Sequence, residues 1–138
     1  MSSGTSGAEM FIHDPSPPVV AEALYRVGYW LVNSDRFEDG KHVFRSMLHG
    51  APDDERAWIG LALCHERSGE VGKADRLLGL GRQACPRSAR TALAQARFLD
   101  QTSRANEADR VFEVALELAE QASDEELVAS IAAERAAR

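Results

Sequence analysis

The chain has 138 residues, of which 44% are hydrophobic and 28% are charged. That length predicts a single domain, with enough apolar residues for a sizeable core. The 16 Lys and Arg residues stand against 22 Asp and Glu residues, a net charge of −6, which argues against a duplex nucleic-acid binder because such a protein needs a basic face.

The sequence also argues against a membrane or secreted protein. It has no run of about 18 apolar residues, so no membrane insertion is expected. The N-terminus lacks the basic-then-apolar order of a secretion signal. The 2 cysteines, Cys64 and Cys85, are too few for a disulfide scaffold, which makes a reducing cytoplasm the expected location.

The first 18 residues differ in composition from the rest. Residues 1–7 are rich in Ser and Gly, and three prolines follow at 15, 17 and 18. Such a segment cannot offset the entropy cost of ordering by burying apolar surface. We therefore expect a flexible leader over 1–18 and a single repeat domain over 19–138.

From Val19 onward, the chain repeats with a period of 34 residues. Pro52 and Pro86 are separated by that interval. Other positions keep the same spacing across three copies: Gly28, Ala62 and Ala96; Gly40, Ala74 and Ala108; Phe44, Leu78 and Phe112; Met47, Gly81 and Ala115. This predicts repeats near 21–54, 55–88 and 89–122.

Small residues followed by a bulky one are typical of two closely packed helices. We predict first helices near 20–33, 54–67 and 88–101, and second helices near 37–50, 71–84 and 105–121. The motif Ser123-x-x-Glu126 resembles a capping box and predicts a further helix over 124–137 that covers the end of the array. The fold class is therefore all-α.

These positions resemble the tetratricopeptide repeat, with its pattern W-x2-L-G-x2-Y…A-x3-F…P. The second unit carries the pattern most fully, at Trp58, Leu61, Ala62, Ala74, Leu78 and Pro86. The expected architecture is thus three tetratricopeptide repeats and a capping helix.

A narrower resemblance is to the SycD/LcrH class of type III secretion chaperones. It is carried by Leu24–Tyr29, Phe37–Phe44, Asp54–Arg56 and Ile59–Leu61. This resemblance implies a cytoplasmic chaperone of a bacterial secretion system, which binds an extended apolar segment of a secreted translocator. It also implies a client segment of the type Pro/Val-x-Leu-x-x-Pro.

The first helices of such an array line its concave side. Residues at i, i+3 or i+4 and i+7 share one helix face, and here that face is apolar with flanking arginines, which suits an extended peptide. The predicted peptide-binding residues are Tyr25, Arg26, Tyr29, Val32, Arg56, Ile59, Gly60, Leu63, Arg67, Arg90, Leu93 and Arg97. Gly60 is expected to leave room for a peptide side chain or for a close backbone approach.

Several other readings stay open. The same groove would suit a co-chaperone of needle or export-gate components, or a scaffold subunit with a permanent partner. Trp30 lies off the core, and either packs under the leader or contributes to self-association in a homodimer. We find no motif for catalysis, a metal or a cofactor, so the protein is expected not to be an enzyme.

Overall fold

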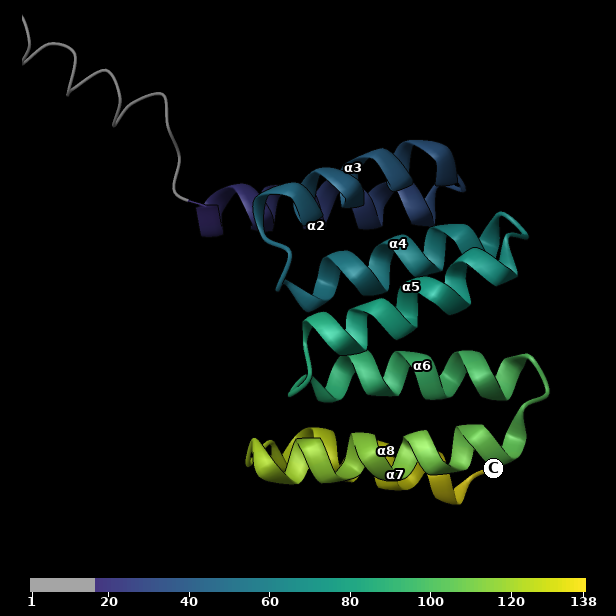
Figure 1. Ribbon diagram of the computed structural model, residues 1–138. Coiled ribbons are helices and arrows are strands. Elements are labelled where there is room, and N and C mark those ends of the chain that lie inside the picture. The colour runs from purple at the N-terminus through teal and green to yellow at the C-terminus, as the bar shows by residue number, and fades with distance from the viewer. Residues whose placement is uncertain (1–16) are drawn as a thin grey trace, which may run out of the picture.

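The computed structural model describes residues 17–138, and within that range the chain is entirely helical (Figure 1). The helices are α2 (Pro17–Asn33), α3 (Phe37–Gly50), α4 (Glu55–Arg67), α5 (Val71–Ala84), α6 (Ala89–Gln101), α7 (Ala105–Gln121) and α8 (Glu125–Ala136). They pair as α2/α3, α4/α5 and α6/α7 and stack in that order, with α8 against α7. The all-α prediction is confirmed, whereas most of the expected leader lies outside the described residues.

The helix boundaries agree with the predicted ones to within one residue, except at the start of α2. That helix begins at Pro17 rather than near residue 20. Prolines suit the first turn of a helix, because the N–H groups there have no intrahelical partner and the fixed φ is already helical. Pro17 and Pro18, which the prediction placed in the leader, therefore belong to α2.

The turn inside each helical pair has the same backbone geometry. Asp35, Gly69 and Ser103 follow one another at the repeat period, and each has a positive φ, of 58°, 82° and 63°. The residue after each one donates its N–H to a carbonyl in the last turn of the first helix, at 2.8–2.9 Å. This left-handed closure satisfies carbonyls that the helix end leaves free.

The core is built from the large residue that recurs in each second helix. Phe44, Leu78 and Phe112 are all 3% exposed or less. A methyl group placed on Gly28 or Gly60 would lie within 3 Å of the Phe44 ring. The ring of Phe44 therefore fills the space between α2 and α4. A side chain at position 28 or 60 would occupy that space, so both positions are glycine.

The last helix covers the open end of the stack, as predicted, but it is capped differently. Ser123 has a φ of 55° and belongs to the turn that ends α7. The carboxylate of Asp124 accepts a hydrogen bond from the Leu127 N–H at 3.1 Å. The predicted Ser123 capping box is therefore wrong, because a serine that closes one helix in the left-handed region cannot also begin the next. Ile131 of α8 is fully buried against the core.

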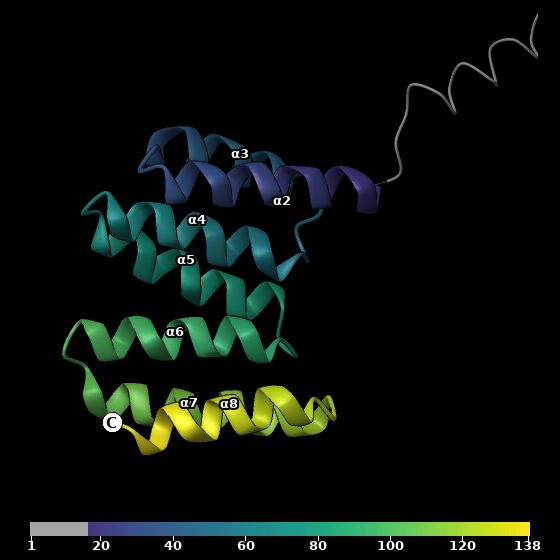
Figure 2. The ribbon, with the colours of Figure 1, turned by 180° about the vertical axis from the view of Figure 1, so that it is seen from behind.

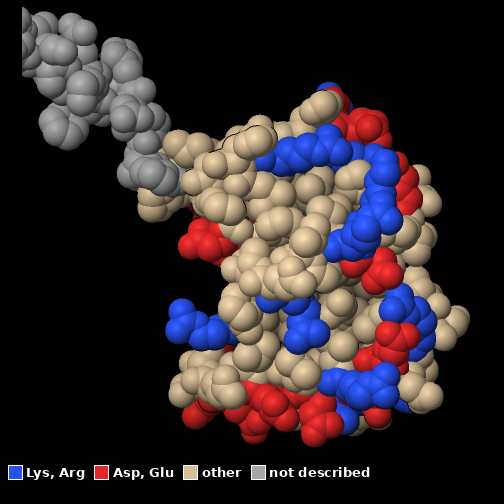
Figure 3. Space-filling view, viewed as in Figure 1, with Lys and Arg blue, Asp and Glu red and all other residues tan. Residues whose placement is uncertain are grey.

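The arrangement places α2, α4 and α6 side by side in the stack, all running in the same direction (Figures 1 and 2). Figure 3 shows charges of both signs on one face, with acidic side chains along the lower edge over α7. Exposed acidic residues of that helix are Asp109, Glu113, Glu117 and Glu120. Within residues 17–138, no helix combines the length and apolar content needed to cross a bilayer.

Candidate functional site: a groove lined by the first helices

Two neighbouring cavities lie along the side formed by α2, α4 and α6. The larger, which we call the apolar pocket, has a volume of ≈ 360 Å³. It is lined by Tyr29, Ile59, Ala62, Leu63, Glu66, Arg67, Leu78, Ala94, Arg97, Phe98 and Gln101. The smaller, which we call the arginine pocket, has a volume of ≈ 170 Å³ and is lined by Tyr25, Tyr29, Glu55, Arg56, Ile59, Arg90, Leu93, Ala94 and Arg97. The two share Tyr29, Ile59, Ala94 and Arg97 and form one groove.

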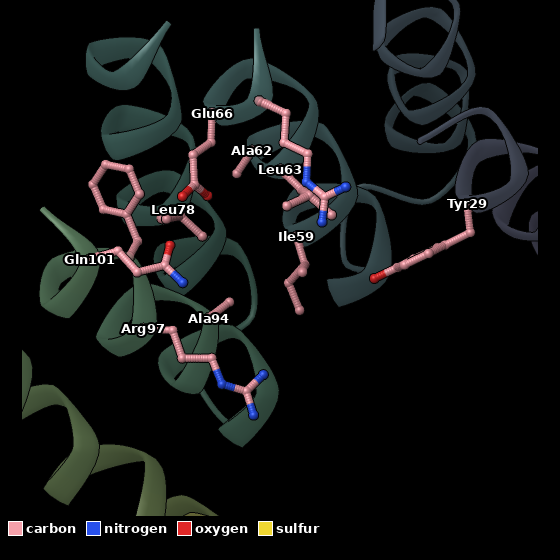
Figure 4. Close-up of a pocket in the computed structure, with 11 residues that line it drawn as sticks. Tyr29, Ile59, Ala62, Leu63, Glu66, Leu78, Ala94, Arg97 and Gln101 are labelled. Carbon is pink, nitrogen blue, oxygen red and sulfur yellow. The ribbon is translucent and has the colours of Figure 1, made fainter. Parts of the chain in front are cut away.

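The apolar pocket reaches past the first helices into the joint between the second and third helical pairs. Its floor includes Leu78 of α5, which is 3% exposed, together with Ala62 of α4 and Phe98 of α6. Figure 4 shows Ile59, Leu63 and Leu78 arranged around this space, with the polar ends of Glu66, Arg97 and Gln101 at its border. Such a cavity suits an apolar side chain whose backbone stays near polar groups.

Glu66 is the acidic group of the apolar pocket. Its side chain is half-buried, and no hydrogen bond or ion pair to it is found among residues 17–138. Burial raises the pKa of its carboxyl group above the ordinary value, because a low dielectric disfavours the charged form. A ligand N–H or hydroxyl donor would therefore find a carboxylate without a competing partner.

Arg56 lines the arginine pocket, and its side chain is held in one position. Arg56 is held by both oxygens of Asp54, at 3.1 and 3.0 Å, and by Glu22 of α2 at 3.1 Å. These carboxylates raise the pKa of Arg56, with Asp54 the main cause. Its guanidinium lies 4.6 Å from the centre of the Tyr25 ring, a cation–π distance. Charge pairing and stacking thus hold this side chain in one position.

The two tyrosines form the α2 side of the groove. Their ring centroids are 4.9 Å apart in an edge-on arrangement, and the Tyr29 ring also meets Phe44 edge-on at 6.1 Å. Burial raises the pKa of the Tyr29 hydroxyl. Both rings are thus held by the core beneath them and offer a rigid apolar surface to a ligand.

Arg97 lies at the junction of the two pockets and is positioned from the last helix. Its guanidinium donates to both oxygens of Glu134 in α8, at 2.8 and 2.7 Å. Glu134 is the main cause of the raised pKa of Arg97. The helix that covers the end of the stack therefore also orients a groove side chain.

All but three of the predicted peptide-binding residues line the groove. Val32 is 1% exposed and packs in the core with Phe44, so it presents no surface to a ligand. The space beside Gly60 is filled by the Phe44 ring and not by a client, which corrects that expectation. Arg26 is exposed and pairs with Glu22 outside both pockets.

The groove also has lining residues that are not among the predicted peptide-binding residues. They are Glu55, Ala62, Glu66, Leu78, Ala94, Phe98 and Gln101. Helical spacing places Glu66 on the predicted groove face, and Ala94 and Gln101 beside that face. Leu78 had no such signal, because it occupies the large position of a second helix, where burial is the rule.

Outside the groove, Trp30 is 60% exposed, and its neighbours on the same face of α2 are also open. Val27 and Val20 are 48% and 41% exposed. The Arg36 guanidinium lies 5.9 Å from the Trp30 ring. This α2 stripe (Val20, Val27 and Trp30) forms an apolar surface at the end of the stack opposite α8.

Residues 17–138 contain neither a metal-binding cluster nor a reactive thiol. Among residues 17–138, no group of three or more His, Cys, Asp and Glu side chains could hold a metal ion. Cys64 and Cys85 are buried thiols. Burial raises the pKa of Cys64 to about 11, which leaves the sulfur protonated and a poor nucleophile.

Comparison with known proteins gives similarity at the level of structure. No protein-family model and no curated protein matches this chain. Among solved structures, the translocator chaperone SycD of Yersinia enterocolitica is 22% identical with a TM-score of 0.75, over 94% of this chain and 96% of SycD. PcrH from Pseudomonas aeruginosa is 23% identical with a TM-score of 0.71, over 91% and 96%.

A further match is the Yersinia enterocolitica SycD in complex with a peptide of the translocator YopD, at 21% identity and a TM-score of 0.62. It spans 89% of this chain and 98% of that one. The chain described here therefore shares the helical fold of these chaperones over nearly its whole described length.

Proposed function

We propose that this protein is a chaperone of a type III secretion system, which binds an extended apolar segment of a translocator in the groove. The observation that carries the proposal is the groove itself, an apolar cavity beside an arginine-lined one, both on the side formed by the first helices. Support comes from the shared fold with SycD, one structure of which contains a translocator peptide.

The groove would act by covering apolar surface, without covalent chemistry. An apolar client side chain would enter the apolar pocket between Leu63, Leu78 and Phe98. A second would rest on the rings of Tyr25 and Tyr29, where one well-buried anchor is worth about 2 kcal/mol or more. A client held in this way cannot pair its apolar segment with another chain, so it stays soluble until it is delivered.

The fixed arginines would hold the client backbone in register. Arg56 and Arg97 keep donors near the floor of the groove while their carboxylate partners hold them in place. Guanidinium groups bind carbonyl oxygens and carboxylates well, because their donors are planar and fixed in direction. The expected client is a segment of the type Pro/Val-x-Leu-x-x-Pro, met in the cytoplasm.

The test is titration calorimetry with a synthetic Pro-x-Leu-x-x-Pro-type peptide. We expect micromolar binding, weakened about tenfold, or roughly 1.4 kcal/mol, by Tyr29→Ala or Leu63→Ala. Leu80→Ala is the matched control, since Leu80 is 50% exposed on α5 and lines neither pocket. Circular dichroism would verify that each variant is folded.

Two outcomes would count against the proposal. One is the absence of peptide binding by the folded wild-type protein, which would favour a co-chaperone or a scaffold subunit that recognises a folded partner. The other is equal weakening by Leu80→Ala, which would place the peptide outside the groove.

We further propose that the α2 stripe (Val20, Val27 and Trp30) contacts a second copy of the chain. The opposite end of the stack is covered by α8, whereas these apolar side chains are 41–60% exposed, and a terminal repeat with an apolar outer face needs a cover. Light scattering should give a dimer mass that falls with Trp30→Ala and not with Leu80→Ala. A mass that Trp30→Ala leaves unchanged contradicts this proposal.

A further inference from the structure

The arginines of the groove differ in how fully they are neutralised. Arg56 and Arg97 each donate to both oxygens of a carboxylate at 3.1 Å or less. Arg90 has a single charged partner among the described residues: its Nε lies 3.8 Å from Oε2 of Glu55. Its side chain is 60% exposed, and the distance to Glu55 is too long for a hydrogen bond. Arg90 is therefore the arginine of the arginine pocket that has no carboxylate at hydrogen-bond distance.

The two oxygens of Glu55 have different partners. Oε1 accepts a hydrogen bond from the hydroxyl of Ser88, the N-cap residue of α6, whereas Oε2 is the oxygen 3.8 Å from Arg90. The charged side chains that line the arginine pocket are Glu55, Arg56, Arg90 and Arg97. Arg56 and Arg97 are paired with carboxylates outside this lining, so an acidic side chain of a client would be attracted to Arg90.

The other end of the groove has the opposite feature. The half-buried carboxylate of Glu66 lines the apolar pocket without an ion pair in the described chain. Arg67 and Arg97 also line this pocket, but Arg97 is paired with Glu134 and Arg67 is exposed. A client acid placed beside Glu66 would meet a like charge at a partly desolvated position, which is unfavourable.

The repeat period gives the spacing of these two features. One repeat period after Glu66 of α4 comes Asp100 of α6, so Asp100 marks the level of Glu66 on the neighbouring, parallel helix. Asp100 lies ten residues after Arg90 in α6. At 1.5 Å of rise per residue, the separation along the groove is about 15 Å. An extended peptide covers that distance in about five residues.

We infer that the groove selects a client segment with an acidic side chain at the end that lies in the arginine pocket, and without one at the end that lies by Glu66. The inference rests on the proposed function and adds a charge requirement to the apolar anchors. It also fixes the direction in which the client lies along the groove.

The experiment uses a neutral Pro-x-Leu-x-x-Pro-type peptide and two derivatives with a single Asp, one just before the motif and one just after it. Titrations are run at low ionic strength, where screening of exposed charges is weak. One Asp peptide should bind about threefold more tightly than the neutral peptide, the gain typical of an exposed ion pair. The other should bind more weakly than the neutral peptide.

Two variants assign these differences to residues. Arg90→Gln should abolish the gain from the favoured Asp, and Arg90→Glu should reverse it in favour of a Lys peptide. Glu66→Gln should remove the penalty on the disfavoured Asp. Arg110→Gln is the matched control, since Arg110 is exposed on α7 and lines neither pocket.

The neutral peptide separates this inference from the proposed function. If it does not bind, both fail. If it binds but the two Asp peptides bind equally well, or if Arg90→Gln leaves their difference intact, the charge requirement is overturned and the proposed function stands.

Discussion

The joint between the first two helical pairs and the joint between the second and third are built from the same repeat positions, yet one is closed and the other holds a pocket. In the first, Phe44 fills the space left by Gly28 and Gly60. In the second, the equivalent residues are Leu78, Ala62 and Ala94, all three of which line the apolar pocket. An aromatic ring between two glycines seals the joint, whereas a leucine between two alanines leaves a cavity beside it.

The polar contacts of the two joints differ at one repeat position. The first is crossed by Lys41 of α3, which is 3% exposed and bound to Glu70 at 2.6 Å. It is also crossed by the bond from Arg56 to Glu22. One period later, Arg56 becomes Arg90, whose nearest carboxylate is 3.8 Å away. The Lys41–Glu70 pair returns one period later as Asp75 and Arg104, at 3.0 Å. The two joints therefore differ in packing and in how closely one arginine is paired.

The largest expected effect is on the free energy of unfolding, and it comes from overpacking the closed joint. In Gly60→Ala, the new Cβ would clash with the Phe44 ring, so the free energy of unfolding should fall by about 2 kcal/mol, as for an overpacked core. Adding Phe44→Leu should restore part of the loss, since the pair then resembles the second joint. Urea denaturation measures both.

Gly79→Ala is the control for this prediction. No atom lies within 4 Å of the Cβ that it adds, so the substitution should stabilise α5 by about 0.5–1 kcal/mol through helix propensity. If Gly60→Ala stabilises the protein to the same extent, the ring of Phe44 does not close the joint.

A smaller effect, on binding, comes from filling the open joint. Leu78→Phe should place a ring in the apolar pocket and weaken the Pro-x-Leu-x-x-Pro-type peptide about tenfold, with the helical signal unchanged. Leu80→Phe is the control, because Leu80 lies on the same helix and is half exposed. Unchanged affinity in Leu78→Phe would show that the client anchor lies elsewhere.

The smallest effect concerns pH. Lys41, Lys73 and His65 lower the pKa of Glu70 from 4.5 to about 2. A carboxyl group whose pKa is lower in the folded state stabilises the protein above its unfolded pKa, and this contribution is lost as pH falls through the folded value. Glu70→Gln should therefore lower stability at pH 7, and the gap to wild type should narrow between about pH 5 and pH 2.

Urea titrations at several pH values measure that gap. Glu120→Gln, an exposed change on α7, should show no such narrowing. A gap for Glu70→Gln that is constant with pH would mean that the ion pairs with Lys41 and Lys73 do not stabilise the fold.

The sequence predicted the groove better than it predicted the depth of each residue in it. Helical spacing placed Val32 on the same face as Tyr25 and Tyr29, but its side chain packs against Phe44 in the core. Gly60 was assigned to the client because its missing side chain indicates a close approach. The approaching group is the Phe44 ring of the preceding helix pair, and a glycine cannot specify which neighbour will use its space.

Other outcomes depended on contacts between distant residues. Gln95 and His65 depart from the repeat pattern, yet each has a polar partner within the fold. Gln95 accepts from Arg82 at 2.9 Å, and Nδ1 of His65 meets Glu70 at 3.0 Å. The repeat pattern gives only the preferred residue type at each position, so it cannot predict these hydrogen-bond partners, which come from another helix or from beyond a turn.

The sequence by itself determined the helices and their order, and it predicted the side on which a ligand would lie. These follow from local signals: a 34-residue period, turns at fixed positions and apolar residues at helical spacing. Only the tertiary structure decided that Leu78 forms the floor of a pocket, that Glu134 orients Arg97, and that Arg90 has no carboxylate at hydrogen-bond distance. Those properties depend on how closely separate helices approach, and that distance is set by side chains far apart in the sequence.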